Sequence, residues 1–397
     1  MFRATGSMLT LGELVCVVIN VREYITGNDS TLWTITARRT TMSFHPFEIT
    51  LTLKPEARFD VIDVAAAIKE KFGDLASRYR KALYCSLHTT AGYLDQRICS
   101  RLRNSRNHLE PFFRAFQNLF PPDAGYHHDR LDLRTELSDA QRRCEPQNAD
   151  SHLTFIGAGL KNCVTYYNRP GMPVYFIDLD GMHENVQRSR QTTILAYNNE
   201  EIVHTDRIVI PMSHHAVDSI NLKDPRFGFF DQIDALLNRY DIQKGRVDIS
   251  LSRKEQHAGL TVNEYENLLI QQDLAEVLKD PLSYVARKGK SFLSEPAAMR
   301  GKAKYYATYD LVHIFNELMD ALLVGQSVIE RIVSRVLSVP AARFLGMKRN
   351  MSLLVSNSDA NGAGKLVQGT YQSPILIQWQ KAQQRERHLD ITITRFK

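Results

Sequence analysis

A long-period repeat constrains the fold of this chain more than any other feature of its sequence. Residues 48–53 read EITLTL, which alternates polar and apolar side chains as a half-buried strand does. Residues 59–72, which overlap the segment ARFDVIDVAAAI at 57–68, then carry apolar side chains at helical spacing and predict a helix. The same order returns in RIVIPM at 207–212 and FFDQIDALLNRY at 229–240. Self-similarity of this kind is typical of a duplicated unit, so we expect two related domains with a boundary near 199–204.

The length and composition of the chain agree with two domains. Its 397 residues, 43% of them hydrophobic, are enough to bury more than one core. We assign residues 44–200 to the first repeat and 201–397 to the second, which carries a helical insertion over about 279–340. Residues 1–43 form an extension of unknown role, because they combine the arginines and hydroxyl side chains of a targeting segment with a Val- and Ile-rich run that favours a strand.

Strands alternate with grouped helices in both halves, which predicts an α+β fold. No GxGxxG follows the first strand, so a doubly wound dinucleotide-binding fold is not indicated. We expect tandem β-sandwich units with helices between the strands. Further strands are predicted at 82–87, 152–155, 163–167, 174–178 and 192–197 in the first half, and at 247–251, 351–355, 366–368, 375–378 and 391–396 in the second.

Charge and cysteine usage narrow the class of protein. The formal charge is +6, with basic and acidic residues interleaved, so a dedicated nucleic-acid binder is not expected. The five cysteines form no CxxC pair, which is typical of a reducing compartment. No apolar run approaches the roughly 20 residues of a membrane helix. We therefore expect a soluble cytoplasmic protein, with an N-terminal targeting segment as the alternative.

Three histidines stand beside the ends of predicted elements. His88 follows the strand at 82–87 and precedes Thr89 and Thr90, His128 lies in the loop segment YHHD, and His152 ends the segment NADSH. Three imidazoles of this kind suit a metal site that keeps one coordination position open, with Asp129 as a further ligand or an orienting group. The alternative is that each histidine is a structural, hydrogen-bonded residue.

The order of these motifs resembles the YjbQ-like family, also called secondary thiamine-phosphate synthases. The family pattern H-T-S-A, F-F-x-R, P-D-x-x-x-Y-x-H-D and D-x-P-x-H is matched by HTTA at 88–91, FFR at 112–114, PDAGYHHD at 122–129 and ADSH at 149–152. The resemblance implies that His88, His128 and His152 are metal ligands. It also implies that Thr89 and Thr90 hold phosphate oxygens.

The two halves complement each other with respect to that family pattern. The first half has Gln96-Arg97 where the family has N-E and lacks its G-T-W-Q block, whereas the second half lacks the histidines but reads LTVNE at 260–264 and GTYQ at 369–372. We therefore predict a site shared between the halves, in which Asn263, Glu264, Tyr371 and Gln372 face the histidines. The alternative is that Asn263 and Glu264 only begin a helix.

The resemblance and the residues together favour an enzyme that uses a divalent metal, Zn, Mn or Mg, on a phosphorylated small molecule. The family activity implies a transferase of the thiamine-phosphate synthase type, with Asp129, Glu264 and Asn263 as catalytic candidates. A hydrolase or lyase acting on another small molecule and a non-catalytic metal-binding scaffold are the alternatives. The family forms trimers, so we expect a homo-oligomer.

Overall fold

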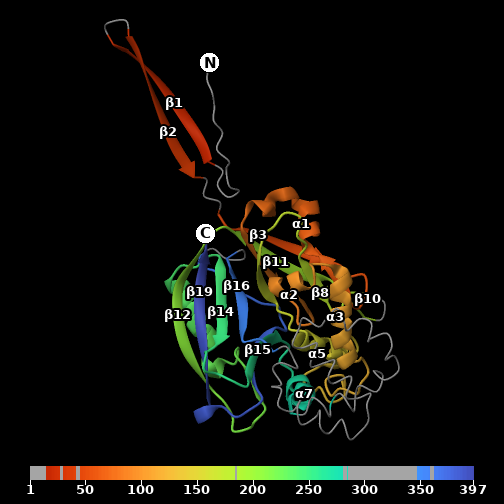
Figure 1. The fold of residues 1–397 in the computed structure, drawn as a ribbon. Helices are drawn as coiled ribbons and strands as arrows, with labels where there is room; N and C mark the ends of the chain where they lie inside the picture. Colours follow the sequence, from red (N-terminus) through yellow and green to blue (C-terminus); the bar gives the residue numbers. More distant parts are fainter. Residues whose placement is uncertain are drawn as a thin grey trace.

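The computed structural model describes residues 15–26, 30–41, 45–183, 186–279, 284, 347–357 and 362–397. The predicted helical insertion over 279–340 therefore lies almost wholly outside the described residues. The N-terminal extension contains an antiparallel hairpin of β1 (Val15–Thr26) and β2 (Ser30–Thr41), drawn in red away from the body in Figure 1. Its first strand overlaps the Val- and Ile-rich run that favoured a strand.

Two antiparallel sheets form the first half of the body. The larger has the strand order β3-β11-β5-β7 and the smaller has the order β4-β8-β6. The strands are β3 (Phe47–Leu53), β4 (Asp60–Asp63), β5 (Lys81–Ser86), β6 (Ala91–Gly92), β7 (Cys163–Tyr167), β8 (Tyr175–Asp178) and β11 (Arg190–Tyr197), with a small pair β9 (Met182–His183) and β10 (Val186–Gln187). The helices are α1 (Val64–Phe72), α2 (Gln96–Arg101), α3 (Arg106–Leu119), α4 (Asp139–Arg142) and α5 (Ala149–Gly157), with the short turn η1 (Gly73–Arg78).

The second half repeats this strand order. Its larger sheet runs β12-β19-β14-β16-β17 and its smaller sheet β13-β18-β15. The strands are β12 (Glu200–Pro211), β13 (Asp218–Asn221), β14 (Gly245–Leu251), β15 (Ala258–Asn263), β16 (Asn350–Ser356), β17 (Lys365–Val367), β18 (Ser373–Gln378) and β19 (Glu386–Phe396). The helical segments are η2 (Pro225–Phe227), α6 (Phe229–Arg239), η3 (Leu268–Asp273), α7 (Leu274–Lys279) and η5 (Gln383–Arg385). An internal duplication predicts such matching orders.

The two larger sheets meet through a small apolar core. Leu83 and Cys85 of β5 and Cys163 of β7 pack with Leu354 of β16 and Phe396 of β19. The ring of Phe396 also stacks on Tyr197, with 3.7 Å between the ring centroids. Burying a large apolar side chain contributes about 1.5–3 kcal/mol to folding, so this core ties the halves into one body. The mixture of sheets and helices confirms the predicted α+β class.

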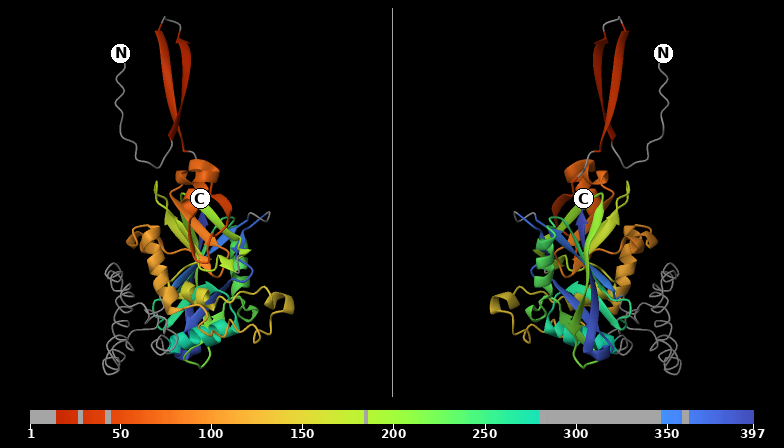
Figure 2. Two further views of the ribbon diagram at one scale, coloured as in Figure 1. Left: turned by 90° about the vertical axis from the view of Figure 1, so that its right-hand side faces the viewer. Right: turned by 90° about the vertical axis from the view of Figure 1, so that its left-hand side faces the viewer.

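A second contact between the halves positions the candidate site. The segment η3–α7 of the second half contributes Leu269, Leu274 and Val277 to the main core of the first half, beside Phe120 of the loop after α3. Figure 2 shows this teal helical segment at the base of the body, next to the yellow α5 region. The residues between β15 and η3 therefore lie against the loops of the first half.

Two predicted elements differ from the structure. The strand predicted at 152–155 is part of α5, and the helix predicted over 59–72 begins with the strand β4 before α1. Every residue of α5 is buried, so the helix has no solvent-exposed polar face, and the short run LTFI at 153–156 does not by itself separate helix from strand. In α1, the Asp63 carboxylate accepts the Ala66 N–H and caps the helix only after β4 has ended.

Within the described ranges, no helix combines the length and the apolar character needed to cross a bilayer.

Candidate metal centre

Two of the three predicted histidines lie side by side in the interior. His128 comes from the loop between α3 and α4, and His152 comes from the first turns of α5. Their side chains are 0% and 1% exposed, and their ring centroids are 5.2 Å apart. Glu264, which directly follows β15 of the second half, completes the group. One donor atom from each of the three lies within 4.8 Å of the other two.

Carboxylates hold the loop that carries His128. Asp273 of η3, which is 1% exposed, accepts the backbone N–H groups of His127 and His128, each at 2.9 Å. Asp129 accepts the N–H of Ala149 at 3.0 Å and so joins the loop to the start of α5. A buried carboxylate that accepts backbone N–H groups fixes local geometry strongly, because leaving those groups unpaired is costly.

The two ring nitrogens of His128 have different partners. Nδ1 lies 2.9 Å from Glu266 Oε2, and the same carboxylate accepts the N–H groups of Leu268 and Leu269. Nε2 lies 3.3 Å from Asn148 Oδ1. Because Glu266 accepts at Nδ1, Nε2 is the nitrogen that could ligate a metal, and an ion there would replace its contact with Asn148.

His152 has the same arrangement with a neutral acceptor. Its Nδ1 lies 2.6 Å from Asn263 Oδ1, whereas its Nε2 lies 3.6 Å from Glu264 Oε2. Asn263 is held in turn, because its Nδ2 donates to Thr89 O at 3.2 Å and its Oδ1 accepts the Glu264 N–H. The amide of Asn263 therefore orients the ring of His152 and directs Nε2 towards Glu264.

The electrostatics of the two rings differ. Burial, reinforced by the positive charge of His128, lowers the pKa of His152 to about 3, so this ring is neutral. Burial alone would lower the pKa of His128, but the hydrogen bond to Glu266 and the charge of Glu264 outweigh it and raise the pKa. Burial likewise opposes ionisation of Glu266, yet the bond to His128 and two backbone N–H groups lower its pKa.

Arg134 connects the group to further acids. It is 2% exposed and contacts Glu136, Glu145 and, at 3.1 Å, Oε1 of Glu264. The guanidinium thus occupies one carboxylate oxygen of Glu264 and leaves Oε2 directed at His152. Nearby, burial raises the pKa of Asp150 to about 6 against the opposing charge of Arg58.

The third predicted histidine, His88, lies outside this group. Its Nε2 accepts the backbone N–H of Gln191 at 2.7 Å. Burial, together with the charges of Arg190 and Arg188, lowers its pKa to about 4. Among the described residues, the third donor beside His128 and His152 is Glu264. The role of His88 as a ligand stays a prediction.

The other predicted site residues take several positions. Thr90 is buried and its hydroxyl lies 3.4 Å from a guanidinium nitrogen of Arg190, while Thr89 is bound through its carbonyl by Asn263. The Gln372 amide donates to Ser86 O and to His88 O, each at 2.9 Å. Tyr371 is 69% exposed and its side chain faces solvent.

The structure therefore brings Asn263, Glu264, His128 and His152 together from two halves of the chain. Sequence reasoning missed Glu266, Asp273, Asn148 and Arg134. Glu266 stands two residues after the predicted Glu264, and Asn148 opens the segment that ends at His152, so proximity to a predicted residue was the available signal. Arg134 and Asp273 had none, because the site residues that they contact, Glu264 and His128, are distant from them along the chain.

The donor set suits a borderline divalent ion. Two imidazoles and one carboxylate are found around catalytic zinc and around non-haem iron. Ligands at about 2.0–2.2 Å in tetrahedral geometry lie roughly 3.5 Å apart, so donors within 4.8 Å of one another need only small side-chain shifts to close on an ion.

No protein-family model matches this chain, and no curated protein matches it. Among solved structures, a YbjQ-like protein of unknown function from Sulfolobus solfataricus is 17% identical, covers 50% of this chain and 99% of its own, and has a TM-score of 0.26. A hypothetical protein from Aeropyrum pernix is 13% identical over 48% of this chain and 98% of its own, with a TM-score of 0.27.

A third match is an uncharacterized conserved protein of the YjbQ family from Clostridium acetobutylicum. It is 12% identical, covers 47% of this chain and 98% of its own, and has a TM-score of 0.21. Each of the three matches thus spans half of this chain or slightly less. At these TM-scores the likeness has no bearing on the site.

Proposed function

We propose that this chain holds one divalent metal ion between Nε2 of His128, Nε2 of His152 and the carboxylate of Glu264. The observation that carries the proposal is the partner at each Nδ1, which is Glu266 for His128 and Asn263 for His152. Metal-bound histidines usually donate their second ring N–H to a carboxylate or carbonyl oxygen, which fixes the tautomer and the ring orientation. Both rings meet this requirement, and in His128 the ion would take the place of the contact between Nε2 and Asn148 Oδ1.

The number of ligands supports a catalytic role over a structural one. Structural zinc sites are closed by four protein ligands, whereas catalytic sites use three and leave a position for water or substrate. The imidazoles are almost fully buried, but the Glu264 side chain is 18% exposed, so the centre opens on the side of Glu264. A bound ion would supply Lewis-acid activation of a carbonyl or phosphoryl oxygen.

The surrounding residues then have defined tasks. Glu266 and Asn263 orient the imidazoles, Arg134 holds one oxygen of Glu264, and Asp273 fixes the loop of His128. Asp129, a predicted catalytic residue, uses one oxygen to accept the N–H of Ala149 and thereby positions α5. Glu264 is thus the predicted base candidate that also lies within the donor group.

For the substrate we propose a phosphorylated small molecule, in a transferase reaction of the thiamine-phosphate synthase type. The motifs that resemble the YjbQ-like family carry this part, and the backbone carbonyl of Thr89 accepts from the orienting amide of Asn263, so the phosphate-binding threonine of the proposal is joined to the donor group. In the same proposal the chain is a duplicated YjbQ-like unit. The matching strand orders of the two halves support that duplication.

Metal content tests the proposal directly. The full chain, purified with zinc or manganese supplied and then dialysed, is expected to retain about one metal per chain by inductively coupled plasma mass spectrometry. His128→Ala, His152→Ala and Glu264→Gln are expected to lose it. His45→Ala is the matched control, because His45 is an exposed histidine outside the donor group. A metal-free wild type, or ligand variants that keep the metal, would contradict the proposal.

Activity is tested on the metal-loaded chain with a pyrimidine diphosphate and a thiazole phosphate. We expect release of pyrophosphate that chelation abolishes and that Glu264→Gln lowers at least tenfold. If chelation instead unfolds the chain and no pyrophosphate appears, the metal is structural and the transferase is wrong.

A further inference from the structure

Two buried cysteines face each other across neighbouring strands of the first half. Cys85 of β5 and Cys163 of β7 are partners in the register of the larger sheet, and each is 3% exposed. The N–H of Ser86 donates to Asn162 O at 2.7 Å, so the next pair along these strands is a hydrogen-bonded one. Cys85 and Cys163 therefore form a non-hydrogen-bonded pair, the kind in which opposite side chains approach most closely.

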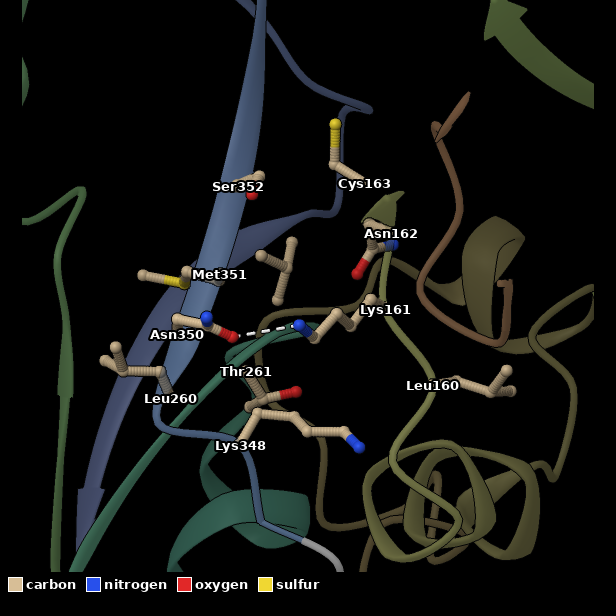
Figure 3. A pocket seen from close by; sticks show the side chains of 11 residues that line it. Leu160, Lys161, Asn162, Cys163, Leu260, Thr261, Lys348, Asn350, Met351 and Ser352 are labelled. Carbon is tan, nitrogen blue, oxygen red and sulfur yellow. Dashed lines mark hydrogen bonds between the residues drawn. The ribbon is translucent and has the colours of Figure 1, made fainter. Parts of the chain in front are cut away.

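The backbone at such a pair suits a disulfide. The Cα atoms of a non-hydrogen-bonded pair lie about 4.5 Å apart, within the range of roughly 4.4–6.8 Å that disulfides span. Both cysteines are free thiols here, and burial together with the hydrogen bond to Cys85 raises the pKa of Cys163. In Figure 3 the sulfur of Cys163 points away from Lys161 and Lys348, which line the small pocket drawn there.

The second half shows that the duplicated framework does not require this pair. Its strands β14 and β16 have the same arrangement, because the N–H of Leu251 donates to Arg349 O beside the register pair of Ser250 and Asn350. A serine and an asparagine thus occupy the positions that two cysteines have in the first half. The thiol pair is therefore a property of the first half and not of the shared strand order.

A bond between the two sulfurs would cross-link a strategic part of the chain. It would join β7, at the end of the strand order β3-β11-β5-β7, to its neighbour β5. The segment enclosed by the bond, residues 86–162, carries both His128 and His152. The thiols also belong to the small core in which Leu354 and Phe396 of the second half pack on the first.

We propose that Cys85 and Cys163 form a redox modification site, which a hydroperoxide converts to an intramolecular disulfide. One thiol loses its proton and attacks a peroxide oxygen, the O–O bond breaks, and a sulfenic acid and one water form when the oxidant is hydrogen peroxide. The other sulfur then attacks the sulfenic sulfur, the S–O bond breaks, and a second water leaves. Two thiols lose two electrons in all, and the peroxide gains them.

Burial slows this reaction but favours one product. An oxidant reaches side chains that are 3% exposed only when the packed sheets open locally, so Cys144, which is exposed, should be oxidised sooner. A sulfenic acid formed at Cys85 or Cys163 has the second thiol beside it and is captured before it reacts further. In a reducing compartment the disulfide is transient and returns to two thiols by exchange.

Peptide mapping of the full-length chain tests the site. The folded chain is treated with hydrogen peroxide, its remaining thiols are blocked with N-ethylmaleimide in urea, and tryptic peptides are analysed by mass spectrometry. We expect a peptide pair linked through Cys85 and Cys163, at least tenfold more abundant than any other linked pair and removed by dithiothreitol. The midpoint of thermal unfolding should rise by roughly 5–10 °C, because the bond closes a long loop. Cys85→Ala should leave Cys163 unlinked and the midpoint unchanged.

The second half supplies a matched control for the backbone geometry. Ser250→Cys with Asn350→Cys, in a chain that also carries Cys85→Ser and Cys163→Ser, places thiols at the equivalent but less buried pair and should form a linked peptide faster. If that pair links while the wild-type chain keeps Cys85 and Cys163 free, burial prevents the reaction and the proposal is wrong. It is equally wrong if the wild-type link is no more abundant in the folded chain than in a chain unfolded in urea before oxidation. The wild-type result decides even if a variant does not fold, and it does not depend on the metal centre.

Discussion

The corner after β5 in the first half and the corner after β14 in the second half are built alike, but the place of His88 in the first corner is taken by Glu255 in the second. His88 precedes Ala91 by three residues, as Glu255 precedes Ala258, and the two alanines begin the equivalent strands β6 and β15. His88 Nε2 accepts the N–H of Gln191 on β11, and Glu255 accepts the N–H of His388 at the same place on β19.

This correspondence separates His88 from the other two predicted histidines. A neutral imidazole nitrogen and a carboxylate oxygen perform the same task at the two corners, which is to accept a backbone N–H from the last strand of each half. His88 thus makes a structural contact that Glu255 makes in the second half, and its role as a ligand stays a prediction. His128 and His152 differ from His88, because each has an acceptor at Nδ1 and lies in one donor group with Glu264.

The largest expected effect concerns the buried ion pair that stands beside these corners. Arg190 contacts Asp178, which is 0% exposed, whereas the equivalent Arg387 contacts the neutral Gln378 and the carboxylate of Glu255, which is 11% exposed. Arg190→Met leaves a fully buried carboxylate unpaired, so we expect the free energy of unfolding to fall by about 3–5 kcal/mol in urea titrations. Arg387→Met should cost less, because Gln378 is neutral and Glu255 is less buried and keeps the backbone N–H of His388.

The double variant Arg190→Met with Asp178→Leu is the control for that prediction. Replacing both members of a buried ion pair by apolar side chains is often neutral, so we expect most of the stability to return. If the double variant is as unstable as Arg190→Met, the loss comes from packing and not from the unpaired charge.

The next largest expected effect is on metal affinity, and it compares equivalent residues of the two halves. Asn263 orients His152, whereas the equivalent Gln96 of the first half bonds to the backbone of Tyr167. Asn263→Ala should weaken metal binding by about 10–100-fold, the usual cost of removing an orienting partner. Competition with a chromophoric chelator measures the affinity.

Gln96→Ala serves as the matched control and should bind metal like the wild type. Equal affinities for the Asn263 and Gln96 variants would show that His152 does not need its partner, and the asymmetry between the halves would lose its functional meaning.

The sequence predicted the strands better than the site. The strand at 163–167 agrees with β7 at both ends, because β-branched and aromatic residues there are bounded by polar ones. α5 was assigned to a strand because its uniform burial removes the polar face that marks a helix. Local periodicity therefore failed where the chain passes through the interior between the two halves.

The site was predictable only in part, for a related reason. His128, His152, Asn263 and Glu264 stand in motifs that can be read along the chain. Glu266 and Asp273 act through contacts with the loop of His128, and such contacts depend on how η3 packs on the first half. No spacing in the sequence reports that packing.

A smaller effect distinguishes the two corners by pH. The pKa of His88 is lowered by burial and by Arg190 and Arg188 to about 4, so the unfolded chain takes up a proton first as the pH falls below about 6.5. Its contribution to stability is therefore lost between pH 6.5 and 4, on the order of 1 kcal/mol for a partly exposed group. His88→Gln should flatten the pH dependence of unfolding in this window.

Glu255 should act in a different window. Burial opposes its ionisation, but the bonds to Arg387 and His388 prevail and lower its pKa. A carboxyl group of this kind stabilises the fold above its unfolded pKa of about 4.5 and loses that contribution at lower pH. Glu255→Gln should therefore flatten the curve only below that pH. Identical pH profiles for the two variants would mean that the corners do not titrate as their partners indicate.

The smallest expected effect concerns the turns that precede β8 and β18. These turns lie at residues 170–171 and 370–371, and Tyr371 occupies in the second half the place that Gly171 has in the first. Because the Tyr371 side chain is 69% exposed, Tyr371→Ala should change the free energy of unfolding by no more than about 0.5 kcal/mol. Its metal content should equal that of the wild type.

Kinetics of the same variant test whether Tyr371 contacts the substrate. A raised KM for the phosphorylated substrate, with kcat retained, would identify Tyr371 as a substrate contact, and Tyr371→Phe would show whether the hydroxyl or the ring makes it. Unchanged kinetics in both variants would remove Tyr371 from the predicted site and leave the second half contributing through Asn263 and Glu264.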